Sequence, residues 1–159
     1  MSAAKRAALL GPAIFGAFDG ANTIIGVVRA VPPGAVMHTA LLGAVSAGVS
    51  MAAGAFLSQR GKDGSPGVVA ALVLGVATAV GTILPALPYT MLAGWWALLG
   101  VGVVLAVVGA GISVARTRLA DDGLAPTPLA RSVFETFLIL ILVCAAVAVV
   151  AAVTPGGGA

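Results

Sequence analysis

Asp19 is a carboxylate within a continuous apolar run that covers residues 7–31. A helix needs about 20 apolar residues to cross a bilayer, and Asp19 lies near the middle of this run. An ionised carboxylate at that depth costs roughly 2.5–3.5 kcal/mol on insertion scales. Membrane proteins keep such a group where it faces a protein-lined cavity and holds a cation or a proton. The chemistry indicated first by the sequence is therefore cation binding inside a membrane.

Other polar and soft side chains follow Asp19 at helical spacing. Asn22 and Thr23 stand at i+3 and i+4, which places them on the same helical face as Asp19. Gly16 and Gly26 fall near that face, and because small residues let a neighbouring backbone approach closely, they predict that it points at protein. The next apolar segment carries a stripe of small and hydroxyl residues, which comprises Gly43, Ser46, Ala47, Ser50 and Gly54, with Met51 beside it. An antiparallel packing of these two helices would bring Met51 and Asp19 to neighbouring depths. A carboxylate attracts any cation, whereas a thioether favours a transition metal.

We therefore expect a metal site with Asp19 and Met51 as its main ligands and neutral oxygens from Asn22, Thr23 and Ser50. Packing alternatives exist for several of these residues. A methionine also fills gaps between helices, and an intramembrane asparagine also bonds a neighbouring helix.

Two further titratable residues lie near the ends of the apolar segments. His38 is either a solvated interfacial residue or an exit-side contact for a proton or metal. Glu135 is explained by the positive end of its helix, or serves as an entrance group.

The composition excludes an ordinary soluble domain, since 60% of the residues are hydrophobic, 8% are charged and the mean hydropathy is +1.16. Five apolar segments, separated by proline, glycine and charged residues, predict a single all-α domain over residues 1–159 with five transmembrane helices. The expected spans are residues 7–31, 35–57, 67–84, 89–115 and 132–153. No phosphate loop, nucleophile–base set or nucleic-acid-binding pattern occurs, so we expect neither an enzyme nor a nucleic-acid partner.

Basic residues are unequally divided between the two predicted sides of the membrane. The N-terminal side holds Lys5, Arg6, Arg60, Lys62, Arg116, Arg118 and Arg131, and the other side holds only Arg29. The positive-inside rule then predicts a cytoplasmic N-terminus. The bias toward alanine, glycine and valine, with arginine exceeding lysine, indicates a bacterial plasma membrane.

Several motifs together resemble the vacuolar iron transporter family. They are Asp19-Gly20, Ser50-Met51-Ala52-Ala53-Gly54, Leu84-Pro85-Ala86-Leu87-Pro88-Tyr89 and Gly111-Ile112-Ser113. The resemblance implies a homodimer of five-helix subunits that moves Fe²⁺, and often Mn²⁺, out of the cytosol in exchange for protons. It also implies a metal path lined by Asp19 and Met51.

The chain departs from the family pattern at two places. Ala55 stands where the family has a glutamate, and the connection at residues 58–66 is too short for the family's glutamate-rich domain, as in its nodulin-like branch.

These observations predict a transporter of Fe²⁺ or Mn²⁺ that works by proton antiport and holds no permanent cofactor. Two alternatives remain open at this point. One is a membrane subunit that binds a partner and transports nothing, and the other is a proton-coupled exporter of a different cation.

Overall fold

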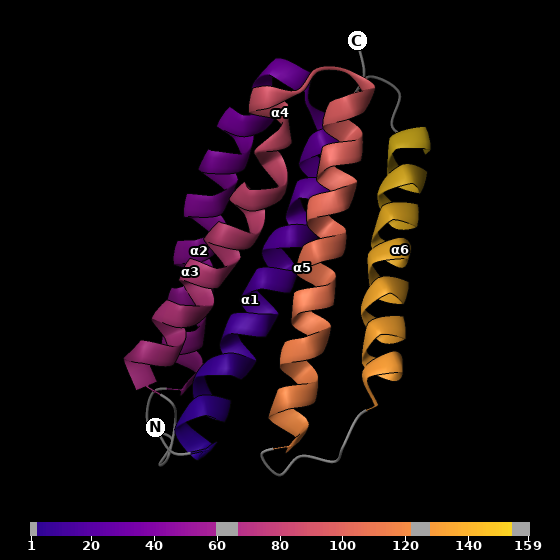
Figure 1. The fold of residues 1–159 in the computed structure, drawn as a ribbon. Helices are drawn as coiled ribbons and strands as arrows, with labels where there is room; N and C mark the ends of the chain where they lie inside the picture. The colour runs from indigo at the N-terminus through magenta and orange to yellow at the C-terminus, as the bar shows by residue number, and fades with distance from the viewer. Residues whose placement is uncertain (1–2, 60–66, 122–127, 154–159) are drawn as a thin grey trace.

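The computed structural model describes residues 3–59, 67–121 and 128–153, and every element in these ranges is a helix (Figure 1). Five helices are long, namely α1 (Ala3–Ala30), α2 (Val36–Gln59), α3 (Gly67–Ala86), α5 (Trp95–Asp121) and α6 (Leu129–Val153). Two are short, namely the 3₁₀ turn η1 (Pro33–Ala35) and α4 (Pro88–Met91). The described residues thus contain five helices long and apolar enough to cross a membrane, which agrees with the predicted number. Arg60 and Lys62, used to predict the orientation, lie outside the described residues.

The predicted start of the fourth span at Tyr89 is wrong. Tyr89 belongs to the short helix α4, which Pro88 begins and which ends at Met91. Leu92 then adopts an extended conformation, and Gly94 has a φ of +57°, which favours glycine because it lacks a Cβ. These residues turn the chain, so the spanning helix begins only at Trp95.

The long helices alternate in direction and lie side by side (Figure 1). At one end of the bundle α1, α3 and α6 begin while α2 and α5 end, and we call this end the base. The most extensive contacts join α3 to α1 and to α2. On its other side α1 contacts α5 and α6, and α6 contacts few elements besides α5. Three helices therefore form a tight unit, to which α5 and α6 are added.

Glycines bring α3 close to both of its neighbours. A Cβ at Gly16 would lie 2.9 Å from the Thr78 hydroxyl, and one at Gly48 would lie 2.8 Å from the Gly75 carbonyl oxygen. Side chains of any size would force these helices apart. Small residues play this role in membrane bundles because lipid supplies no hydrophobic drive between helices, so close van der Waals contact must hold them.

The surfaces away from these contacts are apolar. Large aliphatic side chains are exposed along each long helix, as a bilayer would require. Trp95 and Trp96 are about two-thirds exposed, at 67% and 68%, at the end of the bundle opposite the base. Tryptophans at that position are typical of the membrane–water interface. Beneath this end, a small core joins α1, α2 and α3 through Ile24, Val36, Ala40 and Ala86.

Candidate functional site

The Asp19-Gly20 pair combines a packing residue with a polar one. Gly20 is buried against α3, where an added Cβ would lie 2.7 Å from the backbone nitrogen of Thr82. Successive residues of a helix differ by about 100° around its axis. Asp19 is therefore turned away from α3, and its side chain is only partly buried. The close approach at Gly20 sets the direction in which the carboxylate points.

The Asp19 carboxylate has no hydrogen-bond or ion-pair partner among the described residues. One turn further along α1, the Oδ1 atom of Asn22 is buried and likewise accepts no hydrogen bond. The Thr23 hydroxyl donates to the Asp19 carbonyl oxygen at 3.0 Å, so its proton is used within the helix. The predicted face of α1 therefore presents oxygen acceptors that lack a donor, and a cation or a proton would satisfy them.

The expectation that this face is covered by protein is met only in part within one chain, where Asp19, Asn22 and Thr23 are each partly buried. Gly16, which lies near the edge of the face, packs on α3, but a Cβ added at Gly26 would meet no atom within 4 Å. Phe15, on the same stripe as Asp19, is 57% exposed. The Asp19 side of α1 is thus less completely covered than the side that packs on α3.

The second helix shows the same division. Its contact with α3 uses Ala44 and Gly48, which are buried, whereas Ser46 and Ser50 are exposed and Met51 is partly buried. Helical positions place Ser46 and Ser50 on the side of α2 opposite α3, whereas Asp19 lies beside the α3 contact of α1, about 60° from Gly16 and about 100° from Gly20. We call the surface that carries the exposed Ser46 and Ser50 and the partly buried Asp19 the α1–α2 face.

The depths of Asp19 and Met51 differ from the prediction. Gly16 and Gly48 contact overlapping segments of α3, around Leu74–Thr78 and Gly75–Ala79, so they lie at similar depths. Asp19 is three residues from Gly16 away from the base, and Met51 is three residues from Gly48 toward it. At 1.5 Å per residue the two are separated by roughly 9 Å along the bundle axis. Ser46, which the predicted ligand set omits, lies close to the depth of Asp19.

His38 lies apart from these residues. It is exposed near the start of α2, at the end of the bundle opposite the base. Its helical position differs from that of Ser50 by about 120°, so the two point in different directions.

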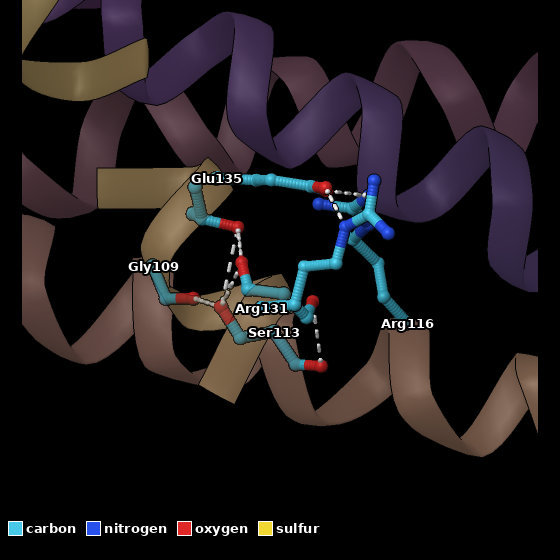
Figure 2. Close-up of polar contacts among 7 residues, drawn as sticks. Gly109, Ser113, Arg116, Arg131 and Glu135 are labelled. Carbon is cyan, nitrogen blue, oxygen red and sulfur yellow. Dashed lines mark hydrogen bonds and ion pairs between the residues drawn. The ribbon is translucent and has the colours of Figure 1, made fainter. Parts of the chain in front are cut away.

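Glu135 takes part in a polar network that the sequence analysis did not identify (Figure 2). Its Oε2 atom pairs with Arg116 of α5 at 3.0 Å, and its Oε1 atom pairs with Arg131 of α6 at 2.9 Å. Each carboxylate oxygen of Glu135 thus faces a guanidinium, so neither oxygen is left free to bind a cation in this arrangement. Opposite charges 19 residues apart gave no signal in the sequence, because their contact depends on how α5 and α6 pack.

Hydroxyl groups join the same two helices one turn deeper in the bundle. The Ser113 hydroxyl donates to the Gly109 carbonyl at 2.9 Å and lies 3.2 Å from Thr136 Oγ1. Thr136 in turn donates to the Ser132 carbonyl at 2.8 Å. Ser113, Ser132 and Thr136 are buried and mutually satisfied, so this cluster holds α5 to α6 and offers no vacant ligand.

No group of three or more His, Cys, Asp or Glu side chains in the described ranges could hold a metal ion. Any metal at Asp19 would therefore need neutral oxygens, a thioether, water or a second chain to complete its coordination.

Comparisons with known proteins leave the family open. No protein-family model, no curated protein and no solved structure matches this chain.

Proposed function

We propose that this protein exports a divalent transition-metal ion, Fe²⁺ or Mn²⁺, from the cytosol by exchange for protons, as the vacuolar iron transporters that its motifs resemble do. The observation that carries the proposal is the Asp19 carboxylate, unpaired near the middle of a spanning helix and one turn from the unpartnered Asn22 Oδ1. A buried carboxylate must be neutralised, and a metal ion and a proton compete for it. That competition is the elementary step of an antiporter.

The separation of roughly 9 Å between Asp19 and Met51 along the bundle axis favours two successive metal-binding sites over one shared site. Met51 and Ser50 lie nearer the base, and Asp19 lies deeper beside Ser46. In the predicted orientation the base is cytoplasmic, so an outgoing ion would reach the thioether first. A soft thioether ligand at the entrance would select transition metals over Mg²⁺ and Ca²⁺ before the ion reaches the Asp19 carboxylate.

A homodimer through the α1–α2 face would complete the path. An open face with a carboxylate and two serines is costly against lipid, because hydrocarbon satisfies none of these groups. In a dimer whose two-fold axis runs along the membrane normal, every residue has its copy at the same depth, and residues near the axis meet their own copies. Two Asp19 side chains would then balance the two charges of one metal ion. The same arrangement would place the uncovered serines inside a water-accessible channel.

The test is metal uptake by proteoliposomes that contain the purified protein. Mn²⁺ or Fe²⁺ should enter when the lumen is more acidic than the outside, because protons then leave down their gradient as metal enters. Asp19→Asn should abolish uptake because the neutral amide cannot exchange a proton for a metal. Asp121→Asn, at the end of α5, removes one carboxylate elsewhere and should transport normally. Uptake that persists unchanged in Asp19→Asn would refute the role of Asp19.

The exposed small residues of α2 favour a second candidate, a membrane subunit that binds a partner and transports nothing. Ser46, Ser50 and Gly54 form an exposed stripe on which another helix could pack closely. This candidate predicts that Asp19→Asn changes assembly or stability while the wild-type protein shows no ion flux above empty liposomes.

A further inference from the structure

A groove of about 260 Å³ opens between α1, α5 and α6, and its α1 wall includes Phe15, one turn nearer the base than Asp19. Its walls are apolar for most of their length and include Ile14, Phe18, Ile112 and Ile139. Arg116 is the only charged residue among the described residues that line it. Along α5, Arg116 lies one turn nearer the base than Ile112. The groove therefore has an arginine at its base end and hydrocarbon side chains toward the bilayer interior.

The charge at the base end is positive. Arg116 and Arg131 share the single carboxylate of Glu135, which leaves one uncompensated positive charge (Figure 2). The side chain of Arg131 is 71% exposed, so it can reach a group outside the protein. An anion at this position would meet favourable charge without disturbing the ion pairs.

We propose that this groove binds an anionic phospholipid of the leaflet at the base, with its phosphate beside Arg116 and Arg131 and one acyl chain between α1, α5 and α6. The polarity of the groove matches that of a lipid in this leaflet, with the head at the membrane surface and the chain directed inward. From Gly11 to Phe18 the α1 wall extends roughly 10 Å, within the roughly 15 Å of one hydrocarbon leaflet. Basic pockets between membrane helices favour anionic head groups in this way.

Charge complementarity favours an anionic over a zwitterionic lipid. A choline head group carries its own cation and would gain little from the extra arginine, whereas a phosphatidylglycerol head group brings one net negative charge. The groove also lies where α6 has few other contacts, so a lipid there would add to the packing of α6 against α1. The inference does not depend on the proposed transport activity.

The experiment is native mass spectrometry of the purified full-length protein titrated with phosphatidylglycerol or phosphatidylcholine. Wild-type protein should retain phosphatidylglycerol more tightly. Arg131→Gln should lower that affinity about fivefold, as removal of one basic residue near a membrane surface does, while the Arg116–Glu135 pair remains. Glu135→Gln should raise the affinity by a similar factor, because it leaves both arginines unpaired. Arg29→Gln removes the same charge at the opposite end of α1 and should change nothing.

A second pair of variants tests the acyl chain without altering charge. Gly11 lines the groove and has open space where a Cβ would stand, so Gly11→Leu should fill it and weaken both lipids. Gly102→Leu, on an open exposed position of α5, should bind as the wild type does.

Equal retention of the two lipids by wild-type protein would overturn the proposal. So would an equal change in phosphatidylglycerol affinity in Arg131→Gln and Glu135→Gln, which remove opposite charges. Unchanged binding in Gly11→Leu, or a loss of dimer in that variant with lipid binding intact, would also overturn it, since the groove would then hold no lipid or would hold a second copy.

Discussion

Gly20 of α1 lies directly against Thr82 of α3, close enough that a Cβ on Gly20 would come within 2.7 Å of the Thr82 nitrogen. The neighbouring residue Asp19 then points away from α3, because one residue along a helix is about 100° around it. The glycine and the aspartate thus have separate roles, one in packing and one in chemistry.

Gly20→Ala should destabilise the bundle by about 1–3 kcal/mol, as overpacking of a close-packed contact does. Gly26→Ala is the matched control, since open space surrounds that position. It should be neutral or stabilising by up to about 1 kcal/mol, because alanine is the better helix former. Thermal unfolding in detergent measures both. Equal effects at the two glycines would mean that α1 and α3 do not pack as closely as described.

Ser113→Ala should weaken the attachment of α6 to α5. Its hydroxyl lies 3.2 Å from Thr136 Oγ1 across the helix interface, and hydrogen bonds between membrane helices contribute about 0.6 kcal/mol on average. Ser58→Ala is the control, since the exposed Ser58 hydroxyl donates only to Ala55 of its own helix. Denaturation in mixed micelles should separate the two variants. A larger loss in Ser58→Ala would contradict the assignment of Ser113 to the interface.

The number of spanning helices could be predicted because proline, glycine and charge separate apolar runs of sufficient length. The depths of residues on different helices could not be predicted in the same way. Gly16 and Gly48 touch α3 while Gly26 and Gly54 touch nothing, although all four look alike in a chain with 22 glycines. Only the packed structure shows which glycines set the register.

The candidate site was predictable to a similar degree. Asp19 stands out because a carboxylate in an apolar run is rare, and that signal needs no tertiary information. Its pairing with Met51 depended on register, and the structure separates the two along the bundle axis. The Arg116–Glu135 pair gave no signal because its contact requires α5 and α6 to be placed first, whereas Arg131 and Glu135 are four residues apart on one helix.

Met51→Leu tests whether the Met51 thioether binds the transported metal. The substitution keeps the side-chain volume and removes only the sulfur, so transport should continue with a severalfold higher KM for Mn²⁺ and weaker discrimination against Mg²⁺. Met91→Leu is the control, because Met91 is 85% exposed at the far end from the base. Competition uptake assays in liposomes measure both variants. An unchanged KM and an unchanged preference would leave Met51 as a packing residue.

Cysteine cross-linking tests the proposed dimer through the α1–α2 face. Residues near a two-fold axis meet their own copies, so Ser46→Cys or Ser50→Cys should form an intermolecular disulfide on mild oxidation. The native Cys144 is exposed on α6 and must first be changed to alanine. Val149→Cys, which is also exposed on α6, should cross-link much less in the same background. Disulfide formation requires Cα atoms within about 7 Å, so a dimer band on a non-reducing gel reports direct contact. Efficient cross-linking at position 149 with none at positions 46 and 50 would place the contact on α6 and leave the Asp19 face open to lipid.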